Sequence, residues 1–581
     1  MTPLDVAQIL REIGQLLQLK GENPFKTRAY EMGADAFLAM PADPEAPGGL
    51  SERVQKGTLG ELSGVGKAID TKVTELVKTG RLEYLEKLRA EFPGPALELM
   101  KVPGLGPKRA AILLRELQPA SVEAVAEACR AGRVRELKGF GEKMEQQILE
   151  GLKEYQARGQ RRPLWETRPQ ALLLLERIKA AAGVVRAELA GSVRRFAELN
   201  ADVDLVASIA KAGLHEPVME AFATAPEVAQ VLSRGDTKCS IRLRTGLQAD
   251  LRVVPDAQFA TALHHFTGSK AHHVKLRGLA RDQGLTISEY ALARIDNGEA
   301  LSITSEAELY RKLGLAEVPP ELREDRGEIE AAKANALPEL IREQDIRGYV
   351  HCHTTWSDGA DSIEDMARAA LARGKEFITI SDHTHAAHYA GGLAPERLKA
   401  QWDAIAEAQE RVPQVRILRG SEVDILEDGR LDLPDETLEA LDVVICSVHQ
   451  RFSLDEEGQM KRLRRAIAHP RFQIWGHPTG RLIGERAPIP ARWQELIELC
   501  AEHGVVVECN GSPRRLDFGA ELLLEARKAG CLVSCSVDAH ATKELDYLPW
   551  AIGTARRGFT ERARVVNARG SAQFLAALRK S

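Results

Sequence analysis

The feature that most constrains the fold is a regular alternation of short apolar runs and amphipathic stretches after Gly348. Seven apolar runs are strand candidates: 349–353, 377–382, 415–421, 443–448, 473–477, 505–509 and 532–537. Stretches with helical spacing lie between them, such as 363–372 and 493–503. Seven strand–helix units in one stretch of chain predict a parallel barrel.

Side chains that bind metals stand at or just past the carboxyl ends of these strand candidates. They are His351, His353, Asp358, His383, Glu422, His449, His477, Asp538 and His540. A parallel barrel builds its active site at that end. This set is too large for a single ion, so we expect two or three ions. Mixed imidazole and carboxylate ligands favour Mn2+, Zn2+ or Fe.

An internal repeat marks the first 165 residues. The turn Gly-Val-Gly at 64–66 recurs as Gly-Leu-Gly at 104–106 and as Gly-Phe-Gly at 139–141, each before a helical pattern. Such glycines permit positive φ, and amides at the following helix N-terminus can bind phosphate. The three turns indicate helix-hairpin-helix motifs that grip the DNA backbone. Basic residues flank the second and third copies, although ordinary solvated helix faces have the same composition: Lys101, Lys108, Arg109, Arg133, Arg135, Lys138 and Lys143.

Between residues 184 and 254 the pattern changes to strands. The candidates are 184–189, 203–209, 240–243 and 247–254. Asp202 and Asp204 are two residues apart, so both carboxylates share one face, and Asp250 joins them if its strand is a neighbour. Three clustered carboxylates repel one another unless cations lie between them, which predicts two Mg2+ or Mn2+ ions.

The residues before these aspartates favour nucleotidyl transfer. Gly191 and Ser192 would offer a backbone amide and a hydroxyl to a triphosphate, and Arg195 would neutralise developing charge. One ion would activate a primer 3′-hydroxyl and the other would hold the triphosphate. Asp-x-Asp alone usually marks a turn or a solvated strand, but Gly-Ser at this spacing before it is specific to nucleotidyltransferases.

Three motifs carry a resemblance to a known family: the glycine turns, the Gly-Ser and Asp-x-Asp pair, and His-Phe-Thr-Gly-Ser-Lys at 265–270. With them, residues 1–330 closely resemble a family X DNA polymerase. The resemblance implies a lyase-like helix-hairpin-helix domain at 1–90, fingers at 91–165, a nucleotidyltransferase palm at 166–256 and a thumb at 257–333. We expect 334–347 to be a linker.

The same resemblance gives roles to individual residues. It implies that Asp202, Asp204 and Asp250 are the catalytic metal ligands. The residues it implies for nucleotide binding are Gly191, Ser192, Arg195, Phe266, Gly268, Lys270 and His273, and those for DNA binding are Gly64, Gly66, Gly104, Gly106, Lys108, Gly139, Gly141 and Arg277. Eukaryotic members carry tyrosine in place of His265 and an acidic residue in place of Lys270, so ribose discrimination stays open.

The N-terminal segment 23–30 and Lys72 resemble the part of the family that binds a 5′-deoxyribose-phosphate end. Lys72 matches the lysine that forms a Schiff base in family lyases, a role that needs a partly neutral amine. Phe25 replaces a phosphate-binding histidine of the animal enzymes. Two alternatives stay open for Lys72, a lyase nucleophile or a phosphate contact.

The C-terminal ligand set resembles a polymerase and histidinol phosphatase (PHP) domain, which implies a distorted (β/α)7 metallohydrolase barrel at 348–581. Members hydrolyse phosphate esters, some are inactive, and no expected ligand is missing here. Asp382, His385, Arg481 and Asn510 are equally consistent with substrate-binding and structural roles. The whole multidomain chain, α+β followed by α/β, therefore resembles the bacterial family X polymerases that fuse these two units.

That resemblance implies short-gap DNA synthesis in base-excision or end-joining repair, with gapped or nicked DNA and dNTPs as partners. It also implies a metal-dependent 3′→5′ exonuclease or 3′-end phosphodiesterase in the barrel, with AP endonuclease activity as a further option. Two alternatives are a phosphatase for a small metabolite with an inactive polymerase half, and a non-enzymatic scaffold that binds DNA ends. The intact carboxylates Asp202, Asp204 and Asp250 argue against the first, and the two complete sets of acidic or metal-binding residues argue against the second.

Composition excludes several other classes. The net charge is −5, so any basic surface for DNA must be local. No apolar run approaches the roughly 20 residues of a membrane span, and residues 1–20 lack a secretory signal pattern. The eight cysteines form no Cys-x2-Cys pair, which favours reduced thiols. We expect a cytoplasmic bacterial monomer that joins the nucleoid during repair and has no membrane partner.

Overall fold

The computed structural model describes residues 1–578 apart from 2, 39, 41–43, 45–47, 63, 93–94, 101, 103–104, 159–160 and 212–213. The chain forms two compact units, Met1–Gln160 and Arg161–Ser581. None of the helices in the described residues has the length and apolar character needed to cross a bilayer.

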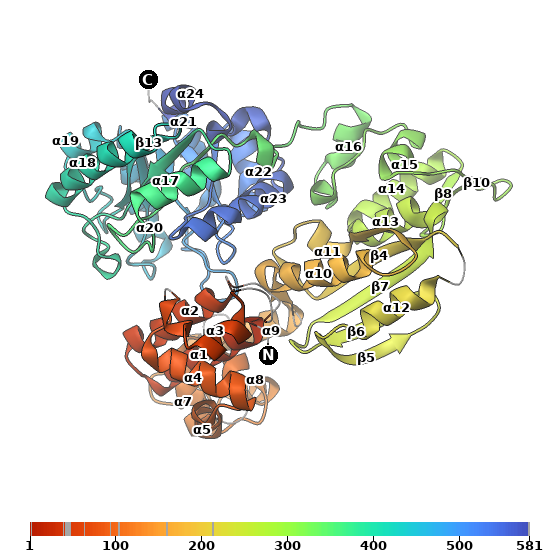
Figure 1. Cartoon of the computed structure of the whole chain (residues 1–581), viewed down its shortest axis with the longest axis horizontal. Coiled ribbons are helices and arrows are strands. Elements are labelled where there is room, and N and C mark those ends of the chain that lie inside the picture. The colour runs from red at the N-terminus through yellow and green to blue at the C-terminus, as the bar shows by residue number, and fades with distance from the viewer. Residues whose placement is uncertain are drawn as a thin grey trace. The chain divides into compact units, whose positions relative to one another are not determined.

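The first unit is helical (Figure 1). Its elements are α1 (Pro3–Lys20), α2 (Pro24–Leu38), α3 (Leu50–Lys56), the 3-10 helix η1 (Leu59–Glu61), α4 (Lys67–Thr79), α5 (Glu83–Glu91), α6 (Ala96–Leu99), α7 (Pro107–Leu117), α8 (Val122–Arg130) and α9 (Glu142–Arg158). One apolar core joins them, with Ile13, Phe37 and Leu113 fully buried. The helical spacing predicted after the first glycine turn forms α4, which buries its apolar face in that core.

The second unit begins with a sheet whose strand order is β2-β4-β7-β6-β5 (Figure 1). Its elements are β1 (Arg162–Pro163), α10 (Leu164–Lys179), β2 (Val184–Leu189), α11 (Gly191–Arg194), β3 (Leu199–Asn200), β4 (Asp202–Ile209), α12 (His215–Ala223), β5 (Val228–Arg234), β6 (Lys238–Leu243) and β7 (Gln248–Pro255). Only β4 and β7 pair in parallel in this sheet. The apolar core lies between the sheet and the helices α10 and α12.

A small α+β region follows the sheet. It contains η2 (Asp256–Gln258), α13 (Phe259–Thr267), α14 (Lys270–Asp282), β8 (Leu285–Ile287), β9 (Leu292–Arg294), β10 (Ala300–Leu301), α15 (Glu306–Lys312), η3 (Pro320–Leu322) and α16 (Glu328–Lys333). Helix α13 packs on β4, through an apolar cluster that includes Val206 and Leu263. The core of this region also takes in Leu340 and Phe559, which come from much later in the chain.

The segment 334–347, expected to be a linker, is packed in the structure. The backbone of Leu340 forms an isolated antiparallel β-bridge with that of Glu561, and the 3-10 helix η4 (Glu343–Asp345) follows. Ile341 and Ile346 are buried in the barrel core described next. The difference arises because these aliphatic side chains sit between charged residues, so the segment has no periodic pattern that would reveal its burial.

The remainder of the second unit is a barrel of seven parallel strands, as predicted. The strands are β11 (Gly348–Tyr349), β12 (Phe377–Ile380), β13 (Arg416–Asp424), β14 (Val443–Ser447), β15 (Ile474–Trp475), β16 (Val506–Asn510) and β17 (Val533–Ser536). They follow one another in sequence order, and a single bridge from Cys352 to Ala539 links the two ends of the sheet. This weak closure makes the barrel a distorted one.

Helices cover the outside of the barrel, and one short helix closes an end. They are α17 (Ile363–Ala372), η5 (His388–Ala390), α18 (Pro395–Arg411), α19 (Asp435–Ala440), α20 (Glu456–Ile467), α21 (Trp493–His503), α22 (Ala520–Ala529), η6 (Thr542–Tyr547), α23 (Leu548–Arg557), η7 (Arg562–Arg564), η8 (Val566–Ala568) and α24 (Ser571–Leu578). Phe574 of α24 stacks on Phe377, the first residue of β12, with ring centroids 4.9 Å apart. The amino-terminal end of the barrel is therefore filled by apolar side chains, which leaves the carboxyl ends of the strands for a site.

A buried cluster of charges joins the sheet to the α+β region. The Glu306 carboxylate accepts hydrogen bonds from both Nη atoms of Arg194, at 3.2 and 2.6 Å. It accepts another from Nη1 of the fully buried Arg323, at 2.5 Å. Burial alone would raise the pKa of Glu306, but Arg323 and Arg194 outweigh it and lower that pKa to about 2. The stabilisation is thus present above the ordinary carboxyl pKa of 4.5 and is lost as the pH falls toward 2.

Glu306→Gln should lower the free energy of unfolding of the second unit by about 3 kcal/mol at neutral pH, since it leaves two arginines with an uncompensated buried charge. Urea denaturation measures the loss. Glu299→Gln is the matched control, because Glu299 forms an exposed ion pair with Arg294 in the same region and should cost less than about 1 kcal/mol. Equal losses in the two variants would contradict the account.

Candidate metal centres

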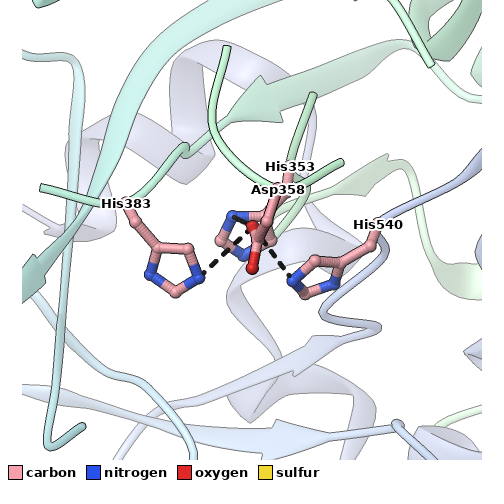
Figure 2. A group of neighbouring side chains, drawn as sticks. All are labelled: His353, Asp358, His383 and His540. Carbon is pink, nitrogen blue, oxygen red and sulfur yellow. Dashed lines mark ion pairs between the residues drawn. The ribbon is translucent and has the colours of Figure 1, made fainter. Parts of the chain in front are cut away.

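The nine predicted barrel ligands all lie at or beyond the carboxyl ends of the strands. His351 and His353 follow β11, His383 follows β12, and Glu422 lies near the end of β13. The structure brings ligand atoms of eight of the nine within 4.8 Å of one another in three groups: His353, Asp358, His383 and His540; His351, His353, Glu422 and Asp538; and His383, Glu422 and His449. In the first group, Asp358 lies between the three imidazoles (Figure 2).

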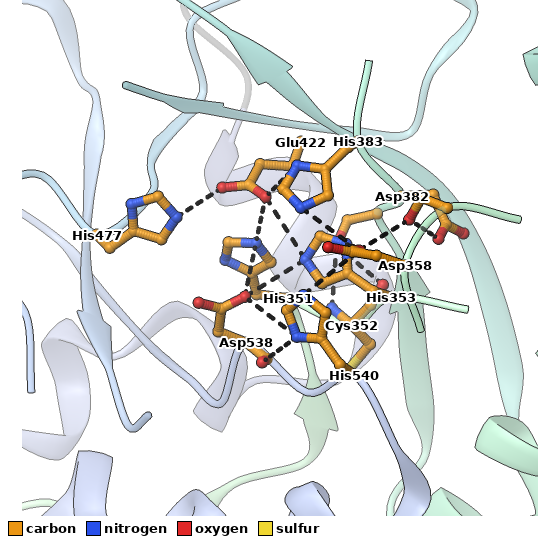
Figure 3. Close-up of polar contacts among 12 residues, drawn as sticks. His351, Cys352, His353, Asp358, Asp382, His383, Glu422, His477, Asp538 and His540 are labelled. Atoms are coloured by element: carbon orange, nitrogen blue, oxygen red, sulfur yellow. Dashed lines mark hydrogen bonds and ion pairs between the residues drawn. The ribbon is translucent and has the colours of Figure 1, made fainter. Parts of the chain in front are cut away.

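Glu422 is the carboxylate at the centre of this arrangement. One of its oxygens lies 2.7 Å from His477 Nε2 and 3.2 Å from His449 Nε2. The other faces three imidazole nitrogens, of His351 at 3.3 Å, of His353 at 3.5 Å and of His383 at 3.0 Å (Figure 3). The side chain of Glu422 is fully buried. All nine predicted ligands therefore belong to one connected cluster.

The donor atoms of this cluster suit bound cations. Within the described residues, several buried ligand atoms make no directed hydrogen bond: His351 Nε2, both ring nitrogens of His353, His449 Nε2, His383 Nδ1, His477 Nδ1 and both Glu422 oxygens. Buried polar atoms left in that state are costly, and ions between them would satisfy them. Burial alone would raise the pKa of Glu422 and of Asp538, but the facing imidazoles hold each pKa well below its ordinary value.

Two carboxylates that the sequence analysis missed orient these ligands. Glu508 accepts a hydrogen bond from His351 Nδ1 at 2.7 Å and one from the backbone amide of His477 at 2.5 Å. Asp424 lies 3.2 Å from His449 Nδ1. Such partners fix ring orientation and tautomer in metal sites. Signals were available: Glu508 interrupts an apolar strand, and Asp424 shares a strand face with Glu422 two residues earlier.

The sequence left four further residues between substrate-binding and structural roles, and the structure gives them different contacts. Asp382 accepts hydrogen bonds from Thr354 and Gln401, which anchors the turn after His353. Asn510 donates to Asp538 at 3.2 Å and so supports a ligand. His385 is exposed and packs its ring on that of His388. Arg481 pairs with Glu198, outside the barrel.

The second predicted centre forms on neighbouring strands, because β4 and β7 are parallel and Asp204 pairs in register with Asp250. Gly191 has φ +60°, and any Cβ there would collide with the Asp204 carboxylate, so the turn requires glycine. Burial, together with the charges of Asp202 and Asp250, raises the pKa of Asp204 to about 7. Cations between these oxygens would relieve this repulsion, which is the fit expected of Mg2+ or Mn2+ ligands.

The residues predicted to bind nucleotide differ in how their side chains are held. Ser192 Oγ donates to Asn200 Oδ1 at 2.6 Å, and Phe266 packs beside the apolar cluster under β4. His273 is mostly buried, and its Nε2 lies 2.8 Å from the His265 carbonyl oxygen. A Cβ at Gly268 would come within 2.9 Å of His273 Nε2. Lys270 is exposed at the start of α14.

Among the residues predicted to bind DNA, Gly66 and Gly106 immediately precede α4 and α7, and Gly141 immediately precedes α9. Gly64 and Gly139 have φ near +90°, and Lys108 is exposed in the first turn of α7. The predicted Gly104 and the flanking Lys101 lie outside the described residues. Arg277 lines a groove of about 530 Å3 together with Arg281 and Arg294. The Nζ atom of Lys72 lies 4.7 Å from the centre of the Tyr84 ring.

Comparison with known proteins agrees with this architecture. Residues 1–82 match the helix-hairpin-helix domain family and 96–154 the SAM-like helix-hairpin-helix tandem family. Residues 262–324 match the DNA polymerase beta thumb, and 350–512 match the PHP domain. The DNA polymerase/3′-5′ exonuclease PolX of Bacillus subtilis (strain 168) is 37% identical over 580 residues, which cover 99% of each chain. The chain belongs to the bacterial family X DNA polymerases with a C-terminal PHP domain.

Other relatives of this family X chain match about a third of its length. A probable phosphatase of Caldanaerobacter subterraneus subsp. tengcongensis is 33% identical over 213 residues, 33% of this chain and 74% of the relative. A probable phosphatase of Thermoanaerobacter sp. (strain X514) is 31% identical over 231 residues, 36% of this chain and 86% of the relative. The PHP match at 350–512 contains strands β12 to β16 and the predicted ligands from His351 to His477.

Glu422→Gln should reduce the metal content of the barrel, because a neutral amide replaces the carboxylate shared by two of the three ligand groups. After incubation with Mn2+ or Zn2+ and desalting, elemental analysis should find two or three ions per wild-type chain and at least one fewer in the variant. His503→Ala, at the end of α21, is the control and should retain all of them. Equal metal in wild type and Glu422→Gln would contradict the assignment.

Proposed function

We propose that this chain fills short gaps in DNA with its palm and shortens DNA 3′ ends with its barrel. The observation that carries the proposal is that one compact unit holds two separate ligand clusters. One is a carboxylate triad of the kind that supports nucleotidyl transfer, and the other is a cluster of histidines and carboxylates in a PHP barrel. The relative that covers the whole chain is named for both activities.

In the palm, Asp202, Asp204 and Asp250 would hold Mg2+ or Mn2+. Ions bound there would supply Lewis acidity to the primer 3′-hydroxyl and to the triphosphate. The chain's own groups would position the nucleotide: the Gly191 turn presents backbone amides, Ser192 a hydroxyl and Arg195 a positive charge. Phe266, Gly268, Lys270 and His273 are proposed to line the nucleotide side of this site.

In the barrel, the nine ligands would hold two or three ions of Mn2+, Zn2+ or Fe, which would supply Lewis acidity to a phosphodiester. Glu508 fixes the ring of His351, and Asn510 restrains Asp538. Arg515, whose Nε lies 3.4 Å from Asp538 Oδ2, adds a positive charge at the edge of the cluster, where a phosphate would bind. AP endonuclease activity in the same site is part of the proposal.

Gapped or nicked DNA is the proposed partner, gripped through the helix-hairpin-helix amides, Lys108 and Arg277. The domain boundaries expected from the sequence, near residues 90, 165, 256 and 333, belong to this proposal. So do a monomeric state, a cytoplasmic location and recruitment to the nucleoid during base-excision or end-joining repair.

A small-molecule phosphatase is a second candidate for the barrel, favoured by the relatives that match about a third of this chain and are named probable phosphatases. A soluble phosphomonoester and a labelled DNA primer, offered to the same preparation, separate the two. Release of phosphate from the ester without shortening of the primer would favour this second candidate.

Asp250→Ala should abolish extension of a labelled primer on a one-nucleotide gap and leave shortening from the 3′ end intact, because only the palm loses a ligand. His351→Ala should do the reverse. Gel analysis with Mn2+, with and without dNTPs, measures both. A wild-type chain that extends the primer but never shortens it would contradict the exonuclease half of the proposal.

Lys72→Ala tests the lyase assignment. If the amine forms a Schiff base, borohydride should trap wild type on DNA with a 5′-deoxyribose phosphate, and the variant should lose at least about 90% of the adduct. Lys67→Ala, at the start of the same helix α4, is the control. Equal trapping of wild type and Lys72→Ala would leave Lys72 with the other role, a phosphate contact.

A further inference from the structure

The residues directly after the nucleotide-binding turn contact the barrel. Phe196 has φ +59° and is almost fully buried. Its ring meets Trp550 of the barrel edge-on, with centroids 5.9 Å apart, and the Arg168 guanidinium lies 5.0 Å from its centre. Gly553 of α23 lies so close to the Phe196 ring that any Cβ there would collide with it. The barrel therefore provides a fitted seat for this side chain.

A second contact on the same helix involves Arg195 itself. Nη1 of Arg557, the last residue of α23, donates to the Arg195 carbonyl oxygen at 2.9 Å and to Glu324 Oε1 at 2.7 Å. The same Glu324 oxygen accepts from Arg195 Nε at 2.9 Å, and Arg195 Nη1 donates to the Thr267 carbonyl oxygen at 2.7 Å. Arg557 thus holds both the backbone of Arg195 and the carboxylate that orients its guanidinium.

The charged groups of this second contact are largely shielded from solvent, so the strength of their hydrogen bonds depends on how they are placed. The side chains of Arg195, Glu324 and Arg557 are 14%, 16% and 11% exposed. Burial alone would raise the pKa of Glu324, but Arg557 and Arg195 outweigh it and lower that pKa. Charge-assisted hydrogen bonds in such surroundings are stronger and more directional than exposed ones.

A third contact fixes the far end of the loop. Arg481 of the barrel pairs with Glu198 through two nitrogens, at 2.6 and 3.1 Å. Its Nε donates to the Arg515 carbonyl oxygen at 2.9 Å, and its Nη2 also donates to the Leu516 carbonyl oxygen at 2.5 Å. The segment 195–198 is therefore tied to the barrel at both ends.

We propose that helix α23 of the barrel is a positioning element of the polymerase site. Arg557 and Gly553 hold Arg195 and Phe196, and thereby fix the end of the short helix α11 that presents Gly191 and Ser192 to a triphosphate. Pre-ordering this turn removes an entropic cost that nucleotide binding would otherwise meet. The inference rests on the proposed function of the palm and adds a role for the barrel that does not depend on the barrel's own chemistry.

Arg557→Ala should raise the KM for dNTP in gap filling by roughly tenfold and lower kcat by a smaller factor, since Arg195 loses the position from which it contacts the triphosphate and faces the developing charge. Arg556→Ala is the matched control, because Arg556, which precedes Arg557 on α23, pairs with Glu321 and the Ile341 carbonyl instead. The KM of this variant should stay within about twofold of wild type. Both variants should keep the wild-type rate of primer shortening. Arg557→Lys, which retains one charged donor, should recover part of the loss.

Gly553→Ala provides an independent variant, because the added methyl group displaces the Phe196 ring. It should raise the KM for dNTP, and Phe196→Ala, which removes the same contact from the other side, should raise it too. An unchanged KM in both Arg557→Ala and Gly553→Ala would overturn the proposal. An equal rise in Arg556→Ala, or a parallel loss of extension and shortening, would overturn it too. These results are distinct from a failure of the proposed function of the palm, because in that case the wild-type chain itself would add no nucleotide.

Discussion

The carboxylate of Glu422 is buried among five imidazoles, and the arrangement of the barrel follows from that burial. A buried carboxylate is tolerated only when opposite charges or metal ions surround it. Residues far apart in sequence must then converge, and the carboxyl ends of parallel strands are the place where they can. The apolar plug formed by α24 at the other end, and the helices outside, keep those strand ends in place.

The sheet of the second unit also holds carboxylates close together, but they are less buried than Glu422. Asp204 and Asp250 are register partners on parallel strands, so their repulsion is built into the sheet. The turn at Gly191 lies against this carboxylate, and the loop that follows leads directly to the barrel through Phe196 and Glu198. The two predicted centres therefore lie in one compact unit, although each is formed by its own set of side chains.

Much of this could be predicted from the sequence, and the exceptions have physical reasons. The seven barrel strands were found because strands buried on both faces form continuous apolar runs, and the helices α17 and α21 have the predicted bounds. Strand β5 was missed because its side chains are largely exposed and carry no alternation. Convergence of the metal-binding side chains followed from their places at strand ends. The contact of the Phe196 ring with Gly553 could not be predicted, because a contact between residues so distant in sequence leaves no local pattern.

The most direct test of two separate metal centres is anomalous diffraction from crystals of the chain with gapped DNA, a non-reactive dNTP analogue and Mn2+. The account predicts anomalous peaks at two places: between Asp202, Asp204 and Asp250, and among the barrel ligands around Glu422. Peaks at one place alone, or manganese bound away from both sets of side chains, would contradict it.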